Sequence, residues 1–262
     1  MVGGVESLMP RMAAPNLSEI AQNIELGQDG LWEARTVSDV SYPESGNDLC
    51  FAIEESSFWF RHRNNCILEA IKSFPVAGAF FDVGGGNGYV ARALQNAGLE
   101  VVLVEPGLAG ARNALKRGVR HVVRATLEDA EFLPEVLSAV GLFDVVEHIE
   151  DDRAFLAKIN RFMVCGGRAY LTVPAFDWLW SREDKDAGHW RRYTVRSLTR
   201  VLEETGYAVE FGTYFFGLLP LPILLLRVLP YRLGFASKEP TLGTARSDHE
   251  LRVRWPIGSC SG

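Results

Sequence analysis

The sequence predicts an α/β protein with a doubly wound, mostly parallel sheet, and three observations support this fold class. Short apolar runs that suit buried strands alternate with amphipathic stretches that suit helices. Glycines follow two of the helical stretches, at Gly98 and Gly118, where a helix commonly ends. The chain has 262 residues, 47% of them apolar, which is enough to bury one large core.

The predicted elements follow one another between residues 51 and 214. The first is a helix over residues 54–74, which ends before Pro75 because a residue that precedes proline disfavours helical dihedrals. Five strands are predicted after it, at residues 79–83, 101–104, 121–124, 139–143 and 169–173, with helices at 89–97, 110–117 and 151–162. The strands are largely apolar, as expected when helices cover both faces of a parallel sheet.

The two ends of the chain lack this alternation. Residues 1–50 show weak periodicity, so we expect an irregular lead-in before a cofactor-binding domain at residues 51–214. Residues 215–262 form a third part, an apolar segment followed by a tail. The stretch 208–214 suits a sixth strand, whereas a last, antiparallel strand is left open because only 251–259 remains for it.

Composition excludes some functions. The chain has 27 Lys and Arg against 33 Asp and Glu, a net charge of −6, so no uniformly basic face is available and no nucleic-acid partner is expected. The four cysteines are far apart, which disfavours a zinc knuckle or a disulfide framework. Residues 1–30 show no cationic stretch followed by an apolar core, so we expect no secretory signal there. We therefore expect a cytoplasmic protein.

The most informative segment is the loop after the first of the five strands. Its residues form the series Asp82-x-Gly84-x-Gly86-x-Gly88. A strand that runs into glycines and then a helix places this loop at the carboxyl edge of the sheet, where ligands bind in this fold class. Glycine is needed there because a Cβ would block a ligand's approach to the backbone. A dinucleotide fingerprint needs a third glycine where Tyr89 stands, so a dinucleotide enzyme is disfavoured.

The acid and glycine series resembles motif I of the class I S-adenosylmethionine-dependent methyltransferases. The resemblance implies that Gly84, Gly86 and Gly88 line the cofactor and that Asp82 lies near its amino group. It also implies that Glu105, at the end of the second strand, accepts hydrogen bonds from both ribose hydroxyls. The alternative is that this loop is only a glycine-rich turn and that Asp82 has no part in binding a cofactor.

Two later segments, residues 143–152 and 166–174, extend the resemblance to the ubiquinone-pathway type of methyltransferase. It implies that Leu127 and Glu128 lie at the adenine and that Phe143 lies near the adenine or the methionine chain.

The predicted first helix carries an aromatic and basic stretch over residues 58–64. An arginine from this stretch can pair with the carboxylate of the cofactor. The alternative is an amphipathic helix whose aromatic residues pack on the sheet and whose arginines face solvent.

Two histidines are candidate catalytic bases, because an oxygen acceptor needs a base to remove its proton. His148 follows the fourth strand, and His189 lies in an aromatic and basic stretch further along. His148 can equally serve to hydrogen-bond its loop. In some quinone-pathway methyltransferases a matching cluster binds a divalent metal, here Asp144, Glu147 and His148, but such acids are usually solvated and we expect no metal.

The resemblance implies methyl transfer to a small molecule, a lipid or a glycan precursor, and we expect the acceptor atom to be oxygen. The alternative is a catalytically silent cofactor-binding or assembly protein of the same fold. This alternative fits the same cofactor-binding motifs, because binding of the cofactor does not require a catalytic base.

An uncharged run of thirteen residues spans 214–226, followed by Arg227. A helix that spans a bilayer needs about 20 apolar residues, and this segment is shorter and contains prolines. A buried strand and helix is one interpretation. We expect instead that residues 214–229 make a peripheral membrane contact or bind a lipid-linked acceptor, which would make the protein membrane-associated.

Overall fold

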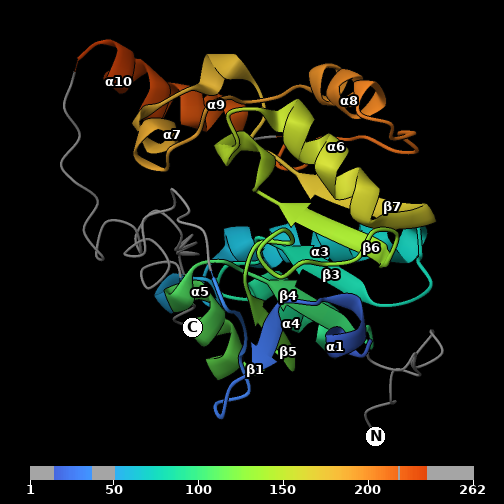
Figure 1. The fold of residues 1–262 in the computed structure, drawn as a ribbon. Helices are drawn as coiled ribbons and strands as arrows, with labels where there is room; N and C mark the ends of the chain where they lie inside the picture. The colour runs from blue at the N-terminus through green and yellow to red at the C-terminus, as the bar shows by residue number, and fades with distance from the viewer. Residues whose placement is uncertain (1–14, 37–50, 218, 235–262) are drawn as a thin grey trace, which may run out of the picture.

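The computed structural model describes residues 15–36, 51–217 and 219–234. A seven-stranded sheet runs through it in the order β1-β2-β5-β4-β3-β6-β7 (Figure 1). All neighbouring strands are parallel except β1 and β2. The predicted doubly wound, mostly parallel sheet is therefore confirmed. The strands are β1 Ile24–Leu26, β2 Trp32–Ala34, β3 Phe80–Val83, β4 Val101–Val104, β5 His121–Arg124, β6 Leu137–Phe143 and β7 Met163–Thr172.

Helices cover both faces of the sheet. One apolar cluster joins the sheet to α3, α4 and α5, and a second joins it to α1, α6 and α8. The strands between them are buried on both sides, which explains their apolar sequences. The α-helices are α1 Leu17–Ile20, α3 Phe58–Ser73, α4 Tyr89–Asn96, α5 Leu108–Lys116, α6 Asp152–Phe162, α7 Arg182–Asp186, α8 Val195–Glu204, α9 Pro220–Ile223 and α10 Leu229–Arg232.

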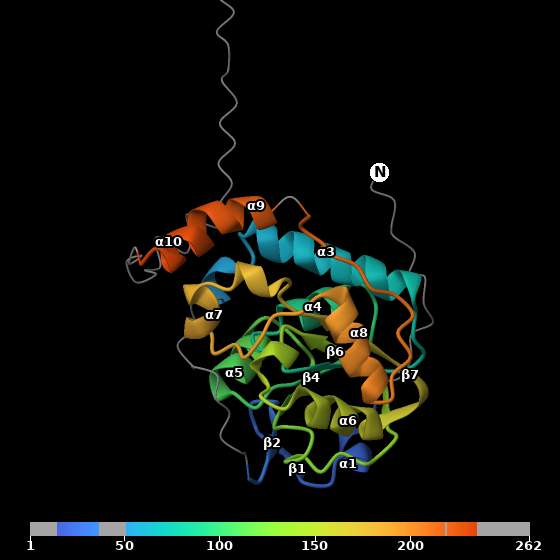
Figure 2. The ribbon, with the colours of Figure 1, turned by 90° about the horizontal axis from the view of Figure 1, so that it is seen from above.

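Three shorter turns connect these elements: the 3₁₀ turns η1 Val146–His148 and η2 Asp177–Leu179, and the π turn η3 Leu224–Val228. With η3 between them, α9 and α10 form one helical run, which lies along the edge of the molecule beyond α7 (Figures 1 and 2). No helix in the described parts of the chain is both long and apolar enough to cross a membrane.

The expectation of an irregular lead-in is wrong for residues 24–34, which supply β1 and β2. β2 pairs with β5 in parallel, with Trp32 opposite Val123, and β1 returns antiparallel to β2. Each strand has three residues, too few for alternation of apolar and polar residues to stand out. The antiparallel strand of the described sheet therefore lies at the β1 edge.

The predicted sixth strand over residues 208–214 is also wrong. The chain there has no regular secondary structure and pairs with no strand of the described sheet. An ion pair of 3.0 Å between Arg168 and Glu210 joins it to β7, and a ring contact between Phe74 and Phe211 joins it to the end of α3. The stretch 251–259, considered for the last strand, lies outside the described residues.

Parallel pairing brings the carboxyl ends of β3, β4, β6 and β7 to one edge of the sheet. The glycine loop follows β3, Glu105 follows β4, and η1 comes soon after β6. Residues that are distant in the sequence therefore converge where ligands bind in this fold class.

Candidate active site

The loop after β3 depends on its glycines. Gly84, Gly86 and Gly88 have φ values of +72°, +50° and +72°, a region that side chains other than glycine rarely adopt. A Cβ on Gly84 would lie 2.8 Å from Val145 Cγ2, and one on Gly88 would lie 2.8 Å from Ala114 Cβ. The loop therefore packs closely against both the segment after β6 and helix α5.

Asp82, the third residue of β3, is 1% exposed. Its carboxylate oxygens have no side-chain hydrogen-bond partner among the described residues, and the backbone amide of Ala91 lies near enough to oppose part of the rise in its pKa. Burial raises the pKa of Asp82 to about 7, although the nearby charge of Arg63 opposes this. A buried, unpaired carboxylate is costly, and a cationic ligand group would offset that cost.

Glu105 comes directly after β4 and holds two loops together. Its carboxylate accepts hydrogen bonds from the Gly86 amide at 2.9 Å and the Gly107 amide at 2.7 Å. Burial raises its pKa, and these two hydrogen bonds oppose the rise. Each carboxylate oxygen has a further lone pair. Binding of ribose hydroxyls by Glu105 therefore stays compatible with this arrangement and stays a prediction.

The residues expected at the adenine lie in different environments. Leu127 is buried in the same apolar cluster as Val104 and Phe132. Phe143 belongs to the opposite cluster and stacks on Phe80, with 6.2 Å between ring centroids. Because both side chains are packed in the core, we expect cofactor contacts from these residues only through backbone atoms. Glu128 is exposed and pairs with Lys158 at 2.9 Å.

An arginine of α3 does face this edge of the sheet. Arg63 Nη2 lies 2.6 Å from Asp144 Oδ2 and 3.3 Å from Thr172 Oγ1, and its side chain is 6% exposed. The Thr172 hydroxyl in turn donates to Asp144 at 2.9 Å. The alternative in which the arginines of this helix face solvent is therefore wrong for Arg63, and pairing of an arginine with the cofactor carboxylate stays a prediction. Asp144 adopts a φ of +59°, and this network holds it there.

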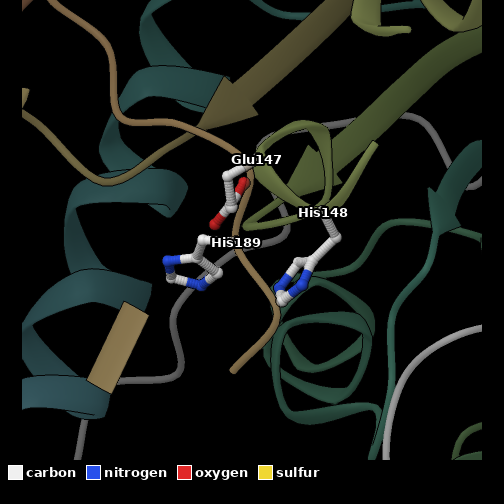
Figure 3. A group of neighbouring side chains, drawn as sticks. All are labelled: Glu147, His148 and His189. Atoms are coloured by element: carbon white, nitrogen blue, oxygen red, sulfur yellow. The ribbon is translucent and has the colours of Figure 1, made fainter. Parts of the chain in front are cut away.

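The two predicted bases, His148 of η1 and His189 of the loop after α7, come together. Their ring centroids are 4.7 Å apart and the rings are nearly perpendicular. Figure 3 shows the carboxylate of Glu147 beside them. Burial, together with the neighbouring His189, lowers the pKa of His148 to about 4. His148 is therefore neutral at pH 7.

Sequence reasoning missed the residue that orients His189. Asp184 of α7 is 1% exposed, and its Oδ1 lies 2.9 Å from His189 Nδ1. Arg192 donates two hydrogen bonds to the same carboxylate, at 2.8 and 2.9 Å, and the Ser181 amide donates a third at 2.8 Å. Burial opposes ionisation of Asp184, but the hydrogen bonds outweigh it and lower the pKa to about 2. The spacing Ser181-x-x-Asp184, typical of a helix start, was the available signal.

A family described as a methyltransferase domain matches residues 60–210, more than half of the chain. The chain belongs to this family. It is a class I S-adenosylmethionine-dependent methyltransferase, and S-adenosylmethionine is its cofactor. No curated protein matches the methyltransferase.

Solved structures share the fold of the methyltransferase. One is phosphoethanolamine N-methyltransferase 2 from Haemonchus contortus in complex with S-adenosyl-L-methionine, with a TM-score of 0.58 and 18% identity over 82% of this chain and 55% of that one. Another, from Methanococcus maripaludis, is described as an S-adenosyl-L-methionine-dependent methyltransferase, with a TM-score of 0.52 and 16% identity over 67% of this chain and 90% of that one. The methyltransferase thus spans about half the length of the H. contortus enzyme.

The residues present fit the cofactor. Asp82 offers a buried carboxylate without a side-chain partner among the described residues, which suits the amino group of the methionine moiety. Gly84 and Gly86 of the loop are only half-buried and carry no Cβ, and Glu105 has lone pairs for hydroxyl groups. These residues would hold the cofactor next to Val145, from which the chain continues to Glu147 and His148.

Proposed function

We propose that this methyltransferase acts on a hydroxyl oxygen of an acceptor that has an apolar part and is reached at a membrane surface. The observation that carries the proposal is the pair of His189 and Asp184 beside His148, at the edge of the sheet that holds the cofactor loop. A hydroxyl must lose a proton during transfer, whereas a neutral amine can attack without a base.

The orientation of His189 supports its role as that base. Arg192 fixes the Asp184 carboxylate as an acceptor, so His189 Nδ1 donates to it and Nε2 carries the lone pair. Proton uptake at Nε2 forms an imidazolium that the Asp184 carboxylate stabilises. S-adenosylmethionine supplies an electrophilic methyl group on a sulfonium. The main task of the protein is to align the acceptor with that group and to exclude water.

Aromatic side chains support an acceptor with an apolar part. Phe176 stacks on Tyr214 with 4.8 Å between ring centroids and on Trp178 with 5.6 Å, while Phe216 stacks on Trp59 of α3 with 5.6 Å. Phe176 and Phe216 adopt φ values of +63° and +61°. Such strained conformations in bulky residues cluster at functional sites. Residues 214–216 thus contact both α3 and the loop after β7 through their rings, and the Tyr214 hydroxyl accepts a hydrogen bond from the Val195 amide at 2.9 Å.

The helical run from α9 to α10 supports contact with a membrane surface. Leu221, Leu225 and Leu226 are 63%, 53% and 76% exposed. The run carries Arg227 and Arg232 and no acidic residue, so it is complementary to an anionic headgroup layer. Arg232 donates to the Trp178 carbonyl at 3.1 Å, which links this surface to the aromatic residues beside the site.

The proposal is tested with methyl-labelled S-adenosylmethionine and vesicles made from a total lipid extract. We expect label in the organic phase, released as methyl iodide by mild hydriodic acid, which cleaves O-methyl groups before N-methyl groups. Gly86→Val, which should not bind the cofactor, is the control.

Three results would contradict the proposal. Label that is stable to the acid would place the methyl on nitrogen, and label confined to water-soluble products would exclude a lipid acceptor. Cofactor binding without any incorporation would favour the catalytically silent alternative.

A further inference from the structure

The cofactor loop at residues 84–88 contains four glycines and a single residue with a side chain, Asn87. Glycine loses more conformational freedom than any other residue when its backbone is fixed, so a loop of this composition is costly to order. If the loop became ordered only when the cofactor bound, that cost would reduce the affinity for the cofactor. Contacts that order the loop beforehand therefore increase this affinity.

Asn87 is buried, and its side chain and its backbone are both anchored. Its Oδ1 accepts from Asn113 Nδ2 of α5 at 3.1 Å, and its Nδ2 donates to Glu54 Oε1 at 3.4 Å. Its backbone carbonyl accepts from Arg117 Nη1 at 2.8 Å. The segment before α3 and the end of α5 thus hold the same loop residue.

Arg117, which directly follows α5, connects these anchors. The same Nη1 lies 2.7 Å from Glu54 Oε2, and the Arg117 side chain is 4% exposed. Its guanidinium lies over two rings, 4.5 Å from the centroid of Phe51 and 5.2 Å from that of Tyr89. Ring faces attract a cation, which accounts for burial of Nε and Nη2 without a hydrogen-bond partner among the described residues. Exposed Glu55 lies 3.9 Å from Nε. The guanidinium is therefore held on several sides.

The geometry of this ion pair indicates a role beyond stability. Burying two charges costs about as much as their attraction returns, so a buried pair is by itself a weak source of stability. Here the pair of Arg117 and Glu54 meets the loop at Asn87, and Glu105 accepts from the amide of the preceding residue, Gly86, at 2.9 Å. Side chains from outside the loop thus fix two consecutive loop residues.

We propose that Arg117, together with Glu54 and Asn87, positions the glycine loop for S-adenosylmethionine before the cofactor arrives. Arg117 acts through the loop, so it is a positioning residue for cofactor binding. Fixing the backbone of one residue costs about 5- to 30-fold in an equilibrium constant, so loss of the network should weaken cofactor binding about tenfold. The inference concerns the cofactor and does not depend on the identity of the acceptor.

Two variants of the full chain test the proposal. Glu54→Gln combined with Arg117→Met removes both charges, because removing one alone would leave the other buried and unpaired. Asn87→Ala removes the side-chain anchor without changing any charge. Calorimetry with S-adenosylhomocysteine should show a dissociation constant raised about tenfold in each variant. Hydrogen exchange of the amides of residues 84–88 in the cofactor-free chain should be faster in both, which a purely structural role at the end of α5 would not cause.

Arg92→Met is the matched control. Arg92 Nη1 donates to the Gly118 carbonyl at 2.9 Å, so this arginine also joins α4 to the chain just after α5, but outside the network. Its replacement should leave both the dissociation constant and the loop exchange unchanged. Arg117→Lys keeps a charge beside Glu54 and should lose less affinity than the double variant.

Two results would overturn the proposal. One is a dissociation constant within twofold of that of the unmodified chain in the variants that fold. The other is weaker binding with unchanged exchange of the loop amides, because the loss of affinity would then not come from loop order. Asn87→Ala alone decides the test if the double variant does not fold.

Discussion

At the scale of single residues, burial decides what Asp82 does. Its carboxylate lies near the end of a core strand with no side-chain hydrogen-bond partner among the described residues, so the free protein holds it close to half protonated at pH 7. Only the ionised carboxylate can pair with the ammonium group of the cofactor. Cofactor binding should therefore be strongest above pH 7 and weaken as the pH falls through that value.

The expected weakening of cofactor binding at low pH can be measured. The dissociation constant of S-adenosylhomocysteine should be nearly constant above pH 8 and should rise about fivefold between pH 7 and pH 6, because the ionised fraction of Asp82 falls by about that factor. Calorimetry between pH 6 and pH 8.5 measures it. Asp82→Asn should bind weakly at every pH, and a flat profile in the unmodified chain would show that Asp82 does not meet the ammonium group.

Glu105 gives a second prediction. Glu105→Ala should weaken cofactor binding by about 1–3 kcal/mol, because it removes a charged acceptor for the ribose hydroxyls and releases the Gly86 amide. Glu100→Ala, which removes an exposed ion pair with Arg120 before β4, is the matched control and should have no effect. An unchanged dissociation constant in Glu105→Ala would show that another group holds the ribose.

The sequence predicted single site residues correctly where one short motif contains them. The spacing from Asp82 to Gly88 is contained in one loop, and that loop requires its glycines. The pairing of His189 with Asp184 depends on how the segment 181–192 folds back on itself, which no short motif specifies. The burial of Leu127 and Phe143 depends on which face of the sheet each side chain meets.

At the scale of elements, the strands between residues 79 and 173 could be predicted because they are buried on both faces and nearly continuous in apolar character. β1 and β2 could not, because three residues carry no periodicity. The stretch 208–214 has strand-like composition, yet side-chain contacts with β7 and with the end of α3, rather than ladder hydrogen bonds, hold it in place.

The helical run of α9, η3 and α10 gives the prediction at this scale. Replacing the exposed Leu225 and Leu226 together by Asp should leave the fold and cofactor affinity unchanged and should abolish sedimentation with anionic vesicles. Val228→Asp is the contrast, because Val228 is fully buried and its replacement should destabilise the fold. Unchanged vesicle binding by the double variant, or none by the unmodified chain, would exclude a membrane contact at this surface.

At the scale of the whole molecule, one edge of the sheet gathers groups from five parts of the chain. The glycine loop, Glu105, the segment from Asp144 to His148, α3 with Arg63, and the loop that carries His189 all meet there. Parallel pairing explains why the strand ends converge, so the sequence could predict the edge. The ion pairs and hydrogen bonds that join these parts arise from tertiary packing and had to be seen in the structure.

The central claim is that the loop after β3 holds S-adenosylmethionine, and direct titration tests it. Calorimetry with S-adenosylhomocysteine and with NAD should show one molecule of the former bound per chain and no heat from the latter. Gly86→Val should lose this binding, because a branched residue at a φ of +50° distorts the loop and its side chain occupies the ligand's path. Binding of NAD with no response to S-adenosylhomocysteine would contradict the account.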